Sequence, residues 1–140
     1  MTITLHQARA IITGAFAHGH AQQMNPLCVA VLDAGGHLVA FERQDGVPYG
    51  RFEVASGKAR AAIAVGVSSR QLGEMATERP HFINGLIGVL GGIVPVAGGV
   101  IVLDSGGSPL GAVGISGDTS DNDEAAARAG ITAAALQAKD

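Results

Sequence analysis

The chain has 140 residues, of which 47% are hydrophobic and 15% charged, and its formal net charge is −3. This length supports one core, so we expect a single domain over residues 1–140. With 4% aromatic residues, no Trp and no basic cluster, the composition argues against a nucleic-acid-binding protein. Soluble monomers usually carry about a quarter charged residues, so the weak charge predicts a homo-oligomer with a buried subunit interface.

The cysteine count and the apolar segments predict where the protein is found. The single cysteine, Cys28, excludes an intrachain disulfide, and its apolar neighbours predict a small core residue. No leader-like segment opens the chain, and the longest apolar stretch, 83–103, is interrupted by Asn84, Pro95 and six glycines. We therefore expect a cytoplasmic protein without a transmembrane helix or a membrane partner.

The first element predicted is a helix. Thr4 and Gln7 have the spacing of a capping box, and apolar residues at helical spacing follow them. Asn25-Pro26 then ends the helix, which we expect to run from Leu5 to about Met24.

Two β-hairpins are predicted from a repeated turn motif. The apolar runs 28–33 and 38–43 flank Asp-Ala-Gly-Gly, and the runs 99–103 and 110–116 flank Asp-Ser-Gly-Gly-Ser. Glycine tolerates positive φ and aspartate bonds nearby backbone groups, so both motifs favour tight turns. With a further strand at 93–97, we expect five antiparallel strands, which excludes most nucleotide-binding α/β architectures.

Helical segments occupy the rest of the chain. An alanine-rich face in the second helix implies close packing against a neighbour, and acidic residues suit the start of the last helix. We expect the segment 79–82 to be irregular. The remaining helical segments are, in chain order, 51–65, a short helix capped by Ser68 or Ser69 and ending near Thr77, a further turn at 84–90, and 121–137.

Common catalytic and nucleotide motifs are absent. No Gly-x-Gly occurs, and Gly57-Lys58-Ala59 lacks the other residues of a phosphate-binding loop. Ser116 lies in a segment one residue short of a nucleophile elbow, and its place at a strand end before Gly117 is more typical of a turn.

Four Gly-Gly pairs occur, and two of them, 35–36 and 106–107, fall in the predicted hairpin turns. The other two, Gly91-Gly92 and Gly98-Gly99, bracket the predicted strand 93–97. Without side chains there, a flat ligand or another backbone can approach closely. We therefore treat Gly91, Gly92, Gly98 and Gly99 as candidate ligand or subunit contacts.

Three histidines are candidate site residues. His18 and His20 lie two residues apart on the first predicted helix, so they point to different sides and do not readily share one metal ion. Half-buried or surface packing is the simplest role for each, and a metal-ligand role suits His18 better than His20. His81 follows Pro80 in the segment expected to be irregular, where functional groups are common.

Charged residues are scarce, and four of them gather around the start of the second helix: Asp45, Arg51, Glu53 and Lys58. Glu53 has the simple explanation that an acid stabilises a helix N-terminus. Lys58 lies among small residues, which leaves two interpretations. It is either a solvent-exposed residue or a cation facing a pocket that takes carboxylates.

Taken together, these segments resemble the GlcG/HbpS family of haem-binding proteins, which includes the C-terminal domain of PduO-type proteins. The resemblance covers almost the whole chain, and it is the ordered set that makes it specific. One departure is Gln44, which stands where a Met typically precedes Asp-Gly. The matching residues are Val31 to Leu38, Asp45-Gly46, Lys58-Ala59, Pro80, Phe82, Gly91-Gly92, Pro95, Gly98-Gly99, Gly111 to Gly117, Asp121, Asp123 and Glu124.

The resemblance implies a profilin-like α/β (α+β) fold, with a five-stranded antiparallel sheet flanked by helices. It also implies homo-oligomers and haem binding, and some members are described as haem-degrading. In some members the iron ligand is a histidine on the first helix, and His18 matches that role by element.

Three functions follow as hypotheses. The first is a haem-binding or tetrapyrrole-binding protein, with His18 as the axial ligand. The ring would then lie in an apolar groove near Phe82 and Gly91–Gly99, and its propionates would pair with Lys58 or Arg51. Another is a scaffold whose apolar surface serves assembly alone.

The second hypothesis is a cofactor-independent isomerase or lyase for a small carboxylated or hydroxylated metabolite. Arg51 or Lys58 would hold the carboxylate of such a substrate, while Asp45, Glu53 or His81 would transfer protons.

Overall fold

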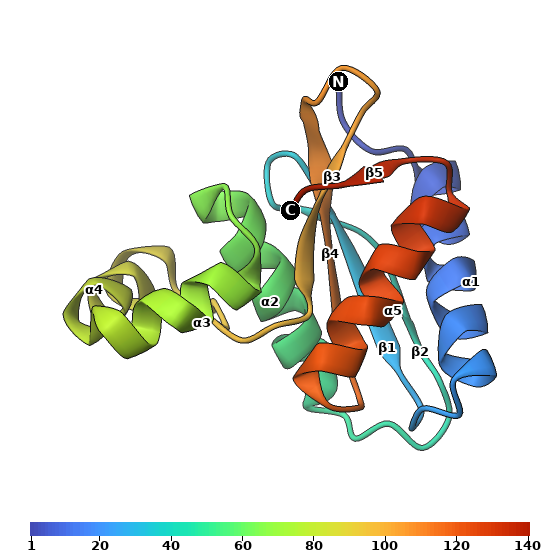
Figure 1. Cartoon of the computed structure of the whole chain (residues 1–140), viewed down its shortest axis with the longest axis horizontal. Coiled ribbons are helices and arrows are strands. Elements are labelled where there is room, and N and C mark those ends of the chain that lie inside the picture. The colour runs from blue at the N-terminus through green and yellow to red at the C-terminus, as the bar shows by residue number, and fades with distance from the viewer.

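A five-stranded antiparallel sheet separates two unequal helical layers in the computed structural model, which describes residues 1–140 (Figure 1). The strand order is β2-β1-β4-β3-β5, so the two hairpins lie side by side through β1 and β4. This arrangement confirms the predicted antiparallel sheet flanked by helices. The strands are β1 (Cys28–Asp33), β2 (Leu38–Arg43), β3 (Gly99–Leu103), β4 (Pro109–Ser116) and β5 (Gln137–Ala138).

The helices are divided unevenly between the two faces of the sheet. Helices α1 (Leu5–Ala21) and α5 (Ser120–Ala133) cover one face, and α2 (Arg51–Val65) covers the other. Beyond α2, helices α3 (Ser69–Glu78) and α4 (Pro80–Leu90) extend from the body as an arm (Figure 1). None of the helices combines the length and the hydrophobicity needed to cross a membrane.

The sheet carries small residues where α2 comes closest to it. Val31 and Ile115 point toward α1 and α5, where they join a core cluster of 16 buried residues. Alternate positions point to the opposite face because side chains alternate along a strand. There Ala30, Ala112 and Gly114 are small, which lets the alanine-rich helix α2 approach the sheet closely.

Glycines allow close contacts between elements, both across the sheet and within one helical layer. A Cβ atom on Gly114 would overlap the carbonyl oxygen of Ala55 in α2. A Cβ atom on Gly130 of α5 would likewise overlap the carbonyl oxygen of Ile11 in α1. Close packing of the second helix, predicted from its alanine content, is therefore confirmed.

Both predicted hairpin turns are present and are built in the same way. In each, one carboxylate oxygen of the leading aspartate, Asp33 or Asp104, accepts two backbone N–H groups at 2.9 Å. The second glycine of each turn, Gly36 or Gly107, has φ of +83° or +85°. A residue with a Cβ atom rarely adopts such a φ, so these glycines are required by the turn.

The strand predicted at Ile93–Ala97 is wrong. Pro95 has no N–H group to give to a sheet, and the N–H of Val94 donates instead to the carbonyl of Gly57 in α2. The fifth strand is β5, which lies where the sequence predicts the end of the last helix. Helix α5 ends at Ala133 because Ala135 takes a positive φ of 60°.

The prediction of irregular structure at 79–82 is also wrong, because α4 begins at Pro80. Proline suits the first helical position, where its missing N–H would have had no partner and its fixed φ is helical. His81 therefore lies on a helix. Helix α1 ends at Ala21, three residues before the predicted Met24.

Replacing Gly114 with alanine should lower the free energy of unfolding by roughly 1–3 kcal/mol or more, since the methyl group has no space between β4 and α2. Urea denaturation measures the effect. The control is Gly88→Ala in α4, where nothing lies within 4 Å of the added atom, and helix propensity predicts a gain of about 0.5–1 kcal/mol. Equal midpoints for the two variants would contradict the close contact.

Candidate functional site

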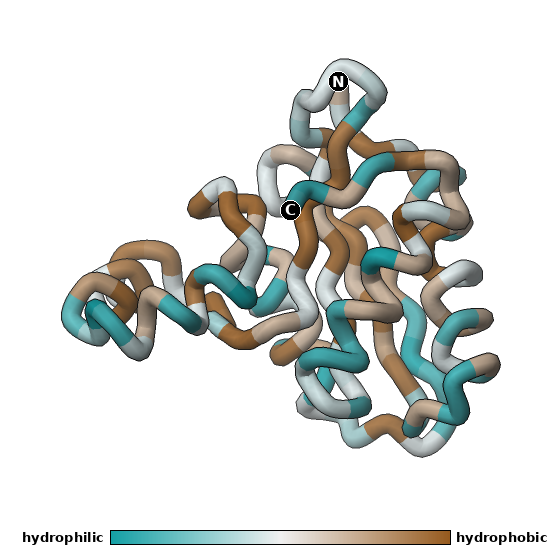
Figure 2. The backbone as a smooth tube through the Cα atoms, viewed as in Figure 1, coloured by the Kyte–Doolittle hydropathy of each residue, from teal (hydrophilic) through white to brown (hydrophobic).

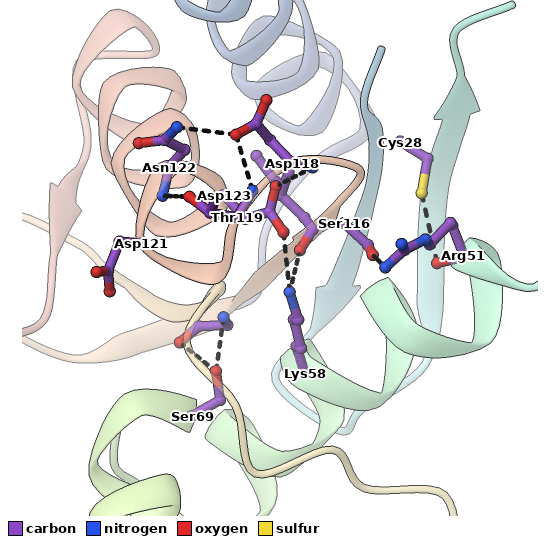
Figure 3. Close-up of polar contacts among 12 residues, drawn as sticks. Cys28, Arg51, Lys58, Ser69, Ser116, Asp118, Thr119, Asp121, Asn122 and Asp123 are labelled. Atoms are coloured by element: carbon purple, nitrogen blue, oxygen red, sulfur yellow. Dashed lines mark hydrogen bonds and ion pairs between the residues drawn. The ribbon is translucent and has the colours of Figure 1, made fainter. Parts of the chain in front are cut away.

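Polar side chains gather at one end of the sheet. Here α1 ends, β1 begins, β4 ends, and both α2 and α5 begin, so five elements from distant parts of the chain meet (Figure 1). Figure 3 shows the contacts among the polar residues of this end.

A buried ion pair lies at the centre of this end. Lys58 of α2 is 2% exposed and Asp123 of α5 is 1% exposed, and 3.1 Å separates Nζ from Oδ2 (Figure 3). The ammonium group also donates to the carbonyl of Ile115, at 2.9 Å. Lys58 is therefore neither solvent-exposed nor directed into an open pocket, and both placements considered from the sequence are wrong.

Two glycines make room for the lysine. A Cβ atom on Gly98 would lie 2.8 Å from Lys58 Nζ, and one on Gly99 would overlap the Lys58 carbonyl oxygen. Both glycines are buried. The structure thus places Gly98 against the side chain of Lys58 and Gly99 against its backbone, apart from the exposed Gly91 and Gly92 at the end of α4.

The ion pair continues into a hydrogen-bonded chain. Asp123 Oδ1 accepts the N–H of Asp118 at 2.9 Å. Asp118 in turn accepts three hydrogen bonds: the N–H of Thr119 at 2.8 Å, the side-chain amide of Asn122 at 2.8 Å, and the N–H of Asn25 at 2.7 Å. These bonds lower the pKa of the Asp118 carboxyl, whereas burial raises the pKa of Asp123.

A third polar group forms at the start of α2. Nη1 of Arg51 donates to the hydroxyl of the buried Ser116 at 3.2 Å (Figure 3). Cys28 lies nearby, and burial raises the pKa of its thiol to about 11. The thiol therefore stays protonated, as expected of a core cysteine. Arg51 forms no ion pair, so its positive charge, unlike that of Lys58, is not neutralised by a carboxylate.

Two surface cavities lie on either side of Met24. The histidines predicted to point to different sides of the first helix do so, because each lines a different cavity. A cavity of about 340 Å³ is lined by His18, Gln22, Met24, Asn122 and Ala125. The second, of about 270 Å³, is lined by Gly19, His20, Met24, Asn25, Pro26, Gln44 and Asp45.

The arm holds the remaining candidates and lies far from these cavities. Phe82 of α4 is half-buried, and the Arg79 guanidinium lies 4.3 Å from the centre of its ring. Helices α4 and α1 are on opposite sides of the molecule (Figure 1). Within one chain the structure therefore does not bring Phe82 to His18.

The three acid–base candidates are also separated. Asp45 lines the cavity of His20, Glu53 is exposed on α2, and His81 is exposed on α4. The residues that sequence reasoning missed are Met24, Asn25, Asp118 and Asn122. Only Asp118-Thr119, which precedes an acidic helix start, carried a local signal, because Thr119 is the N-cap of α5. Its contact with Asn25 spans 93 residues.

Replacing Lys58 with methionine should lower the free energy of unfolding by about 3–5 kcal/mol, because Asp123 is left buried without its cation. Adding Asp123→Asn should restore part of this loss, because asparagine carries no charge. Urea denaturation of the two variants at neutral pH measures both effects, and a double variant no more stable than the single one would contradict an uncompensated charge.

The same loss should depend on pH. The raised pKa means that folded Asp123 holds its proton more tightly than the unfolded chain, whose value is near 3.8. Stability from this group is therefore present below pH 3.8 and is lost as the pH rises through the folded pKa. Lys58 lowers the pKa of Asp123 through its charge and its hydrogen bond, so Lys58→Met should raise this pKa further. The deficit of the variant relative to wild type should therefore be smallest in acid and grow with pH, which urea denaturation at a series of pH values measures.

Comparisons with known proteins agree with this fold. A family model described as "Haem degrading protein HbpS-like" matches residues 3–132. A double mutant of HbpS from Streptomyces reticuli is 26% identical, with a TM-score of 0.82 over 94% of this chain and 86% of that one. No curated protein matches significantly.

Two further solved structures share the fold at lower identity. The structure described as a PduOC:heme complex is 24% identical, with a TM-score of 0.87 over 100% of both chains. The Klebsiella pneumoniae protein ORFY is 20% identical, with a TM-score of 0.87 over 96% of this chain and 92% of that one. Because the family model covers nearly the whole sequence, the chain belongs to the HbpS-like family.

Proposed function

We propose that this protein binds haem and that His18 is the iron ligand. The observation that carries the proposal is the position of His18. Its imidazole is half-buried in the wall of the 340 Å³ cavity and has no hydrogen-bond partner in the chain. The imidazole of a histidine is a common axial ligand of haem iron. Membership of a family described as haem-degrading supports the same reading.

The other groups at this end suit haem as well. Met24 lines the same cavity and offers a thioether, a known haem ligand. Arg51 is the better partner for a propionate than Lys58, because Asp123 already neutralises the lysine. Bound haem would supply the redox and oxygen chemistry of its iron, and the side chains of this chain would hold and orient it.

A homo-oligomer is part of the proposal. Only Met24 and Ala125 give the His18 cavity apolar lining, whereas a porphyrin ring is largely apolar. The arm, in contrast, exposes apolar side chains: Val89 of α4 is 80% exposed and Ile87 is 42% exposed. Figure 2 shows that the arm carries hydrophobic residues out to its end. We infer that α4 packs against another copy of the chain.

The unpaired Arg51 also supports a second candidate, binding of a small carboxylated metabolite. The acid–base chemistry of an isomerase or lyase has less support. Among Asp45, Glu53 and His81, only Asp45 lies in a cavity at the same end of the sheet.

Hemin titration tests the haem proposal. The wild-type protein should give a sharp Soret band with one equivalent of hemin, and His18→Ala should lose it, because the iron then has no imidazole ligand. His20→Ala is the matched control, since His20 lines the other cavity and its variant should keep the band. No specific band in the wild-type protein would contradict haem binding and would favour the carboxylate ligand at Arg51.

The oligomer is tested on α4. Val89→Asp places a charge on the most exposed apolar position of this helix and should shift the molecular mass measured by light scattering toward the monomer. Asn84→Asp is the control, because Asn84 is exposed on the same helix and already polar. A wild-type protein that is monomeric at micromolar concentration would contradict the inferred assembly.

A further inference from the structure

The carboxylate of Asp118 accepts a hydrogen bond from a residue that lines each cavity. Asn122 lines the cavity of His18, and its side-chain amide donates to Asp118 Oδ1 at 2.8 Å. Asn25 lines the cavity of His20, and its backbone N–H donates to Asp118 Oδ2 at 2.7 Å. Met24 lies in both cavities and directly precedes Asn25. The two oxygens of Asp118 therefore join the start of α5 to the loop that leads into β1.

Asp118 is itself held from the interior. It is only half-buried, and hydrogen bonds of exposed groups fix positions weakly. Its N–H, however, donates to the buried Asp123 at 2.9 Å, and Asp123 is fixed by Lys58 at 3.1 Å (Figure 3). The chain of contacts thus runs from the rigid centre of the fold to the surface loop, and each step is a direct hydrogen bond or ion pair.

We propose that Asp118 is a positioning residue, which sets the spacing of the walls at Asn25 and Asn122 and thereby the position of Met24 beside His18. This inference rests on the proposed haem site for its functional consequence. It does not make Asp118 a ligand, because the carboxylate is occupied by three hydrogen bonds within the chain. Groups that hydrogen-bond directly to a metal ligand typically change metal affinity by about 10–100-fold when removed, and Asp118 acts one contact further out, so we expect the lower end of this range.

The test compares Asp118→Asn with Asp121→Asn. The first variant keeps the shape of the side chain but leaves one oxygen where two now accept hydrogen bonds. The second removes the same charge from a neighbouring residue, whose partner is Arg70 of α3. Hemin affinity should fall by about tenfold or more in Asp118→Asn, with a broadened or shifted Soret band, and stay close to wild type in Asp121→Asn.

Amide hydrogen exchange supplies a readout that does not depend on haem. In Asp118→Asn the remaining oxygen should stay at the Oδ1 position, where Thr119 and Asn122 both donate, so that an NH2 group faces Asn25. The Asn25 N–H should therefore exchange faster in this variant, and at the wild-type rate in Asp121→Asn. If Asp118→Asn does not fold, Asp118→Glu keeps the charge, displaces the carboxylate by one methylene, and should change both readouts in the same direction.

The outcomes separate the two proposals. A wild-type protein that binds no hemin overturns the haem site, while faster exchange at Asn25 in the variant still upholds the positioning role. Wild-type hemin affinity together with wild-type exchange in Asp118→Asn overturns the positioning role and leaves the haem site standing.

Discussion

The ion pair between Lys58 and Asp123 is the interaction on which the arrangement of this protein depends. Moving two charges out of water is costly, and their attraction offsets that cost only when the geometry is good and the remaining polar atoms have partners. Further hydrogen bonds hold both partners, since Ile115 accepts from the ammonium and Asp118 donates to the carboxylate, but the raised pKa of Asp123 shows that burial outweighs them. The pair links α2, on one face of the sheet, to α5 on the other.

The close packing around the ion pair depends on small residues. Small residues on the α2 side of the sheet bring this helix close. Gly98 leaves space for the lysine side chain, and Gly99 leaves space for the backbone of Lys58. Larger residues fill the opposite side under α1 and α5. The interior therefore ends at a surface where His18 and Met24 line a cavity and the charge of Arg51 has no carboxylate partner.

Much of the fold was readable from local patterns. The capping box at Thr4 and the Asp-x-Gly-Gly turns each satisfy backbone groups within a few residues, so the sequence alone determines the first helix and both hairpins. The apolar runs on either side of the first turn gave β1 and β2 their bounds. The strand predicted at 93–97 was wrong because an apolar run with one proline has the same sequence pattern in a strand and in a segment that packs on a helix.

The site was only partly determined by the sequence, for a physical reason. Local spacing decided that His18 and His20 face different sides of α1. Only the tertiary structure decided that Lys58 is neutralised, that Phe82 is remote from His18, and that Asp118 reaches Asn25, because these relations join residues far apart in the chain. A lone lysine among small residues has the same sequence pattern in water and in the interior, and its partner 65 residues away decides between them.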